Sequence, residues 1–137
     1  MRNGLAVILF SCAVSAMTGA SAQDVGSAES QATIKQGEVG RLDRDSIGEY
    51  GPATRFEVSI AWNDAEGKRP AEHQSRIVRF VASCKEGTLT VAAVGVFDST
   101  GMLVKRMMVP PGAVDPLTPD AGSPEAKWLK DVCMYRE

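Results

Sequence analysis

The chain of 137 residues has little cysteine, histidine or aromatic residue content, with three Cys, one His and two Trp. It contains no C-x-x-C pair, no zinc-binding motif, no G-x-S-x-G nucleophile motif and no glycine-rich phosphate loop. Catalysis needs a convergent set of reactive groups, and the sequence offers none. It therefore predicts a protein that is not an enzyme, with no catalytic, cofactor-binding or metal-binding residues.

The chain also lacks an excess of positive charge. Its 15 Lys and Arg residues face 17 Asp and Glu residues, for a formal net charge of −2. Surfaces that bind nucleic-acid phosphates are usually rich in Lys and Arg, so nucleic acid is not an expected partner. After the N-terminal region, no segment approaches the roughly 20 apolar residues that a membrane helix needs. We therefore expect no transmembrane segment in the mature chain.

The first residues have the pattern of a secretory signal peptide. Arg2 supplies a positive charge, an apolar run beginning LAVILF follows, and Ala20-Ser21-Ala22 is an A-x-A cleavage site. We predict a signal peptide over residues 1–22, cleavage before Gln23, and export to the periplasm, the cell surface or the medium. Loss of Arg2 would change the net charge from −2 to −3.

Cys12 raises a second interpretation of the same region. The stretch LFSC loosely resembles a bacterial lipobox, in which the cysteine becomes the acylated first residue. Phe10 is bulky where a small residue is usual, and the apolar run before Cys12 is short. Removal of Cys12 with the signal peptide is therefore the preferred interpretation, and the mass of the mature protein distinguishes the two.

Without Cys12, the chain retains only Cys84 and Cys133. Two cysteines in an exported chain are most simply one disulfide. Closing a loop of about fifty residues would stabilise the fold by about 4 kcal/mol on the loop-entropy model. The alternative is a redox-active or metal-binding pair, which the missing C-x-x-C and the single histidine argue against.

Alternating apolar and polar residues predict an antiparallel sheet of about six strands. Tight turns between the later strands indicate an up-and-down meander. A turn-rich corner is expected at DRDSIGEYGPAT, residues 43–54. The expected strands are 32–36, 38–43, 55–62, 75–84, 88–97 and 102–109.

The two ends of the mature chain have different expected roles. Residues 23–30, QDVGSAES, are small and polar and predict a flexible leader before a single domain over 31–137. Near the C-terminus, Ser123 is a suitable N-cap, and Trp128 lies in an apolar stripe that ends at Cys133. The predicted fold class is α+β: an antiparallel meander with one C-terminal helix packed on it and disulfide-linked to it.

The order of these motifs resembles the surface-adhesin protein E family. The likeness spans Val39 to Cys133 and includes LDRDSI, a strand ending in Trp62, S-x-x-x-x-F-x-x-x-C, F-D-S-T-G and GSPEAKWLKDVC. It departs from the family's pattern at VGR, where a Tyr-rich strand is usual. The residues that carry it are Asp43, Ser46, Ile47, Cys84, Gly101, Gly122, Ser123 and Cys133.

This resemblance implies a small exported bacterial protein built on an antiparallel sheet with a C-terminal helix. For the family's best-known member it also implies adhesion to host matrix proteins. The two matching cysteines form a structural bridge in the family.

Several polar residues have both a functional and a structural interpretation. His73 lies in a polar loop with no nucleophile or second acid placed beside it, so a solvated histidine is expected. Asp43 and Asp45 could share a face and bind Ca²⁺. The nearby Arg41 and Arg44 favour instead a corner held by ion pairs or turn hydrogen bonds.

The basic residues of the predicted strands also have two interpretations. Arg76 and Arg79 lie on opposite faces of one strand, and Lys105-Arg106 lie on the last. They form either a local patch for acidic glycans or matrix proteins, or charged protection of a sheet edge, and we expect the second. Trp128 is expected to pack against the sheet rather than line a ligand groove.

The sequence therefore predicts a non-catalytic exported module that binds a protein, either a host matrix protein or an envelope component. The alternative is a periplasmic structural or accessory protein with no adhesive role. Recognition is expected at backbone edges and in the loop Asn63 to His73, with no single side chain assigned to it. An unpaired sheet edge can also pair with a second copy of the chain.

Overall fold

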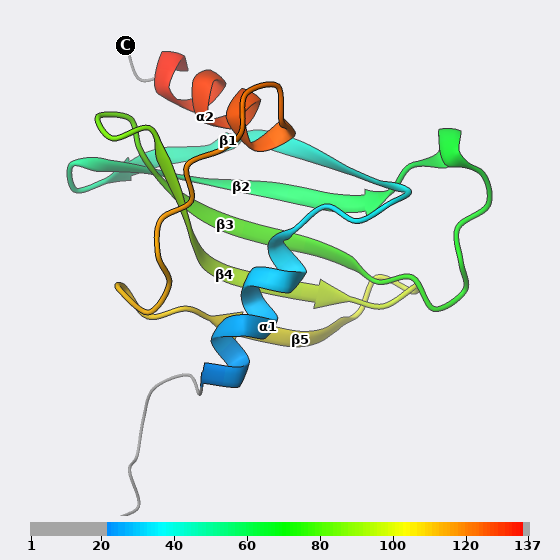
Figure 1. The fold of residues 1–137 in the computed structure, drawn as a ribbon. Helices are drawn as coiled ribbons and strands as arrows, with labels where there is room; N and C mark the ends of the chain where they lie inside the picture. Colours follow the sequence, from blue (N-terminus) through cyan, green and yellow to red (C-terminus); the bar gives the residue numbers. More distant parts are fainter. Residues whose placement is uncertain (1–21, 136–137) are drawn as a thin grey trace, which may run out of the picture.

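The computed structural model describes residues 22–135 as one antiparallel sheet with two helices (Figure 1). Five strands follow one another across the sheet in chain order, so the predicted α+β class and the meander are confirmed. No helix within these residues is long and apolar enough to cross a membrane. The elements are α1 (Ala22–Ala32), β1 (Glu38–Tyr50), β2 (Ala53–Trp62), η1 (Asp64–Glu66), β3 (Ser75–Ser83), β4 (Thr88–Phe97), β5 (Leu103–Met108) and α2 (Pro124–Tyr135).

The expected signal peptide, apart from Ala22, lies outside the described residues, and so does Cys12. The predicted leader, residues 23–30, is described as part of helix α1 rather than as a flexible segment. Ala28 and Ala32 of this helix are buried, and the helix contacts β3, β4 and β5. A short helix of polar and small residues is marginal alone, so packing of these two alanines supports it. Their i, i+4 spacing was the missed sequence signal.

The sheet has one strand fewer than the sequence predicts. Residues 33–37 connect α1 to β1 and end at Gly37, whose φ of 85° turns the chain where a strand was expected. The predicted corner over 43–54 is instead mostly the second half of β1. The pairing of β1 with β2 changes register between Asp43 and Gly48. This irregularity is a bulge, and it accommodates polar residues within an edge strand.

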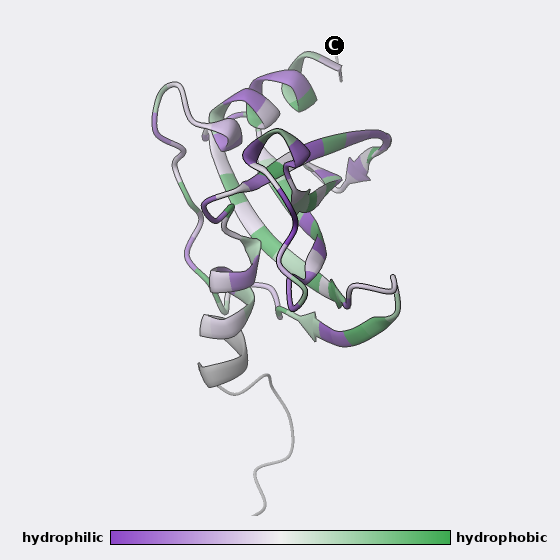
Figure 2. Ribbon diagram, turned by 90° about the vertical axis from the view of Figure 1, so that its right-hand side faces the viewer, coloured by the Kyte–Doolittle hydropathy of each residue, from purple (hydrophilic) through white to green (hydrophobic). Residues whose placement is uncertain are grey.

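The two helices lie on the same side of the sheet, as Figure 2 shows. Phe56 and Phe80 stack on that face with ring centroids 5.5 Å apart, and Phe80 contacts Trp128 of α2 at 5.9 Å. Trp128 is buried, which confirms its expected place in the core. The opposite face of the sheet is covered by neither helix.

A disulfide joins Cys84, directly after β3, to Cys133 in α2. The bridge closes a sequence separation of 49 residues, and it confirms the predicted pairing. At the other end of α2, the Ser123 Oγ accepts the N–H of Ala126 at 3.2 Å, as expected of an N-cap. Cap and disulfide together hold α2 against the sheet beside β1.

Gly40 lets α2 come close to β1. A Cβ atom at this position would lie 2.6 Å from Cζ2 of Trp128 and 2.9 Å from Cδ1 of Ile34. Glycine within a strand usually marks a close approach of another group, and here that group is the indole. Trp128 therefore lies directly on the backbone of β1.

Candidate functional site: the groove between β1 and α2

A groove of about 870 Å³ lies between β1 and α2. Its size falls within the range of roughly 300–1,000 Å³ that is usual for ligand sites. Its apolar lining comes from Ile34, Val39, Leu42 and Trp128. Trp128 therefore packs on the sheet as expected, but it also lines a groove, so the expectation that it would not do so is wrong. The rest of the lining is Glu38, Gly40, Arg41, Arg44, Gly122, Ser123, Pro124, Ala126, Lys127, Lys130 and Asp131.

One wall of the groove is the free edge of β1, the first strand of the sheet. The N–H of Asn63 donates to the carbonyl of Gly37 at 2.8 Å, so this opposed pair is hydrogen-bonded. Such pairs alternate along an antiparallel ladder, which makes Val39 and Arg41 the next residues bonded to β2. The backbone groups of Gly40 and Leu42, two residues of the groove lining, consequently point away from β2 at the edge of the sheet.

Positive charge surrounds this edge. Arg41 and Arg44 line the groove from β1, and Lys127 and Lys130 line it from α2. Within residues 22–135, the ion pairs involve other residues, so these four cations have no carboxylate partner. Asp131 lies in the same lining and offsets one of them. The groove is therefore basic on a chain whose net charge is −2.

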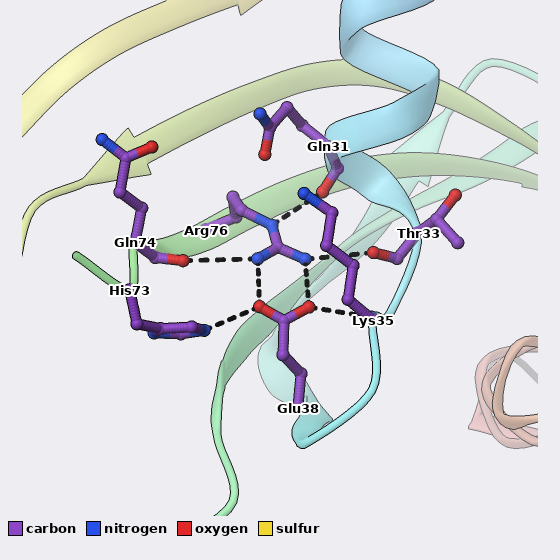
Figure 3. Close-up of polar contacts among 7 residues, drawn as sticks. All are labelled: Gln31, Thr33, Lys35, Glu38, His73, Gln74 and Arg76. Atoms are coloured by element: carbon purple, nitrogen blue, oxygen red, sulfur yellow. Dashed lines mark hydrogen bonds and ion pairs between the residues drawn. The ribbon is translucent and has the colours of Figure 1, made fainter. Parts of the chain in front are cut away.

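The beginning of β1 is fixed by a buried ion pair between Glu38 and Arg76 of β3 (Figure 3). Both side chains are 2 % exposed. The guanidinium binds the carboxylate with both terminal nitrogens, and its Nη2 lies 2.7 Å from Oε1. This two-point contact between β1 and β3 spans β2, which lies between them in the sheet.

Arg76 has all five of its N–H donors satisfied. Two donate to Glu38, and the others donate to the carbonyls of Gln31 at 2.8 Å, Thr33 at 3.0 Å and Gln74 at 3.3 Å. Gln31 belongs to the last turn of α1, where carbonyls have no partner within the helix. One side chain therefore ties α1, β1 and β3 together.

Glu38 accepts two further hydrogen bonds. The N–H of Lys35 donates to it at 2.8 Å, and Nε2 of His73 lies 2.7 Å from Oε2. The His73 ring also contacts Trp62 edge-on, with centroids 5.6 Å apart. The prediction of a solvated His73 is therefore wrong, since its side chain is only 11 % exposed. The carboxylate is engaged by protein groups on both oxygens, which suits a structural role.

Burial alone would raise the pKa of Glu38. Hydrogen bonds from Arg76, Lys35 and His73, together with the charge of Arg76, more than compensate and lower its pKa from 4.5 to about 2. The carboxylate is thus ionised in the folded protein at any physiological pH. The contacts with Arg76, Lys35 and His73 therefore stabilise the charged form of Glu38 in the folded protein.

This pKa shift predicts acid sensitivity. Because the folded pKa lies below the unfolded one, the stabilisation is complete above pH 4.5 and is lost as the pH falls toward 2. The shift corresponds to about 3 kcal/mol.

Urea unfolding between pH 7 and pH 2 should show this loss in the natural protein and much less of it in Glu38→Gln. Glu57→Gln, at an exposed ion pair, should retain the loss. Equal pH dependence in Glu38→Gln and the natural protein would assign the titration to another group.

The other candidate residues have mainly structural contacts. Asp43 accepts the N–H of Asp45 at 3.0 Å, and Ser46 Oγ bonds both the Asp43 carbonyl and the N–H of Glu57. This is the expected corner held by turn hydrogen bonds, built here as a bulge within β1. Within residues 22–135, no group of three His, Cys, Asp or Glu side chains could hold a metal ion.

The basic residues of the strands are divided between the two faces. Arg76 is buried in the Glu38 cluster, so its predicted place in an exposed patch or a protected edge is wrong. Arg79 forms an exposed ion pair with Glu57 at 3.0 Å, and it lines a cavity of about 350 Å³ with Arg106 on the uncovered face. Lys105 is exposed on β5, the other edge of the sheet.

The remaining motif residues shape turns. Gly101 has φ of 85° and Gly122 has φ of 81°. In the F-D-S-T-G turn, the hydroxyl and N–H of Thr100 and the N–H of Met102 donate to Asp98, and these bonds lower the pKa of Asp98. In the loop after β2, the indole N–H of Trp62 donates to the carbonyl of Gly67 at 2.9 Å.

Comparison with known proteins adds no relative. No family model, curated protein or solved structure matches this chain. The groove, its basic lining and the free edge of β1 are the features of the described residues that indicate a binding role.

Proposed function

We propose that this chain is a non-catalytic exported module that binds a protein partner in the groove between β1 and α2. The observation that carries the proposal is the combination of an open groove with a strand edge and four cations that have no partner among residues 22–135. An extended polypeptide is the ligand class that uses a free strand edge, because its own backbone supplies the complementary hydrogen bonds.

The motif resemblance to the surface-adhesin protein E family supports the proposal. The chain has an antiparallel sheet and a C-terminal helix, as that resemblance implies, and the disulfide suits an oxidising compartment outside the cytoplasm. The proposed partner is a matrix protein of a host or a component of the bacterial envelope. The groove, rather than the loop after β2, is the proposed place of contact.

Site-directed photo-crosslinking in cells that naturally express the protein tests this function. A photoreactive amino acid is placed at Lys127 or Lys130 in the groove and, as a matched control, at the exposed Lys105 on β5. The proposal predicts that both groove positions yield the same discrete protein adduct and that Lys105 does not. An adduct from Lys105 alone, or none from either groove position, would overturn it.

The same cells distinguish the two compartments. If the module acts at the surface, protease added to intact cells should degrade it and abolish the adduct. If it is an accessory protein of the periplasm, degradation should require opening of the outer membrane. In either case the groove positions should remain the sites of crosslinking.

A further inference from the structure

We infer that the partner of the groove is an acidic, extended polypeptide segment that adds to β1 as a sixth strand of the sheet. This inference rests on the proposed function of the groove and specifies both the chemistry and the geometry of the ligand. Its two independent supports are the direction of the backbone groups of β1 and the sign of the surrounding charge.

The backbone of β1 offers a short, defined pairing surface. Gly40 and Leu42 each direct one N–H and one C=O away from β2, as the alternation of the ladder requires. The N–H of Glu38 points the same way but is already bonded to the carbonyl of Lys35 at 3.0 Å. Beyond Asp43 the bulge bends the strand. Pairing is therefore confined to a segment of a few residues centred on Gly40 and Leu42.

The lining selects an acidic segment. Side chains of an added strand alternate between the two faces of the sheet, so some would pass beside α2 and others beside the outer face. Lys127 and Lys130 lie on the α2 side, and Arg41 faces the outer side, opposite Ser59 of β2. Because these cations have no ion-pair partner in the part of the chain that the structure describes, carboxylates of the ligand would meet positive charge on both faces.

The same charges argue against a second copy of the chain at this edge. Two β1 strands paired through their outward backbone groups, with Gly40 of one copy bonded to Leu42 of the other, would place the two Arg41 side chains directly opposite each other. Like charges across paired strands are destabilising. The β5 edge offers no such selection, because α1, the helix that contacts β5, carries no Lys or Arg. An acidic partner chain is thus the occupant that the β1 edge favours.

The test begins with a displayed library of random nine-residue peptides, selected on the processed protein at low salt. The inference predicts that the selected peptides are rich in Asp and Glu and that their affinity falls as salt is added. The double charge reversal K127E/K130E should weaken the best peptide at least about tenfold. The matched reversal K105E/R106E on β5 should change its affinity less than about twofold.

N-methylation of the selected peptide then tests strand addition. Methyl groups on every second backbone nitrogen remove the donors along one edge only. One alternating set should reduce binding by more than about tenfold, and the complementary set should leave it nearly unchanged, because only one edge faces β1. Circular dichroism of K127E/K130E confirms that the variant is folded, so a loss of binding reflects the groove.

The possible outcomes separate the inference from the function on which it rests. Selected peptides without acidic residues, or equal tolerance of both methylated sets, would overturn the inference even if crosslinks form from Lys127 and Lys130. The proposed protein-binding function would then stand with a different ligand geometry. A peptide whose affinity is unchanged by K127E/K130E would also overturn the inference, because it would bind elsewhere. So would sedimentation that shows a second copy of the chain pairing at β1.

Discussion

Replacement of Arg76 by alanine is expected to lower the free energy of unfolding by about 3–5 kcal/mol, the usual cost of breaking a buried ion pair from one side. The variant leaves the Glu38 carboxylate buried beside His73 without its main counter-charge. It also leaves the carbonyls of Gln31 and Thr33 without their donor. Urea unfolding at pH 7, followed by circular dichroism, measures the difference.

Two control variants distinguish charge burial from simple loss of packing. Arg79→Ala removes an exposed ion pair on the same strand and should cost less than about 1 kcal/mol. The double variant Glu38→Gln, Arg76→Met removes both charges and should be more stable than Arg76→Ala alone. If Arg76→Ala and Arg79→Ala proved equally stable, the cluster would not hold β1 to β3 as described.

Replacement of both Cys84 and Cys133 by serine is expected to lower the free energy of unfolding by about 4 kcal/mol, from the entropy of the closed loop. The double variant avoids leaving a free thiol. The same loss should follow mild reduction of the natural protein. Thermal unfolding with and without reductant measures it, and a variant as stable as the natural protein would show that packing of Trp128 and Val132 alone holds α2 in place.

The two predictions act on opposite walls of the groove. Arg76 holds the beginning of β1 through Glu38, and the disulfide holds the end of α2. Loss of either contact should loosen one wall while the other remains fixed. Stability and binding should therefore fall together in these variants, in contrast to K127E/K130E, which should lose binding without loss of stability because Lys127 and Lys130 are exposed.

Local patterns in the sequence predict most of this fold. Strict alternation over residues 55–62 and 75–84 reports which side chains face the core, and β2 and β3 lie there. The helix after Ser123 follows from its cap and its apolar stripe. The pairing of Cys84 with Cys133 follows from the expected export of a chain with two remaining cysteines. In each case the sequence signal is either a pattern among a few neighbouring residues or the number of cysteines left in the mature chain.

The candidate site depends on contacts that local patterns do not contain. Glu38 and Arg76 are 38 residues apart, and only the register of three strands brings them together. One signal was available: Arg76 shares the core-facing alternation of Val78 and Phe80, and a cation at such a position requires a buried partner. The groove itself arises from how α2 lies beside β1, which no periodicity specifies.

Amide hydrogen exchange at Gly40 and Leu42 tests the central claim most directly. In the free protein, the amides of these residues should exchange at least about tenfold faster than those of Val39 and Arg41, which donate to β2. Addition of the selected acidic peptide should slow exchange at Gly40 and Leu42 by a similar factor. Protection at both positions would establish β1 as the strand to which the partner adds. Unchanged exchange there, with the peptide bound, would contradict the account.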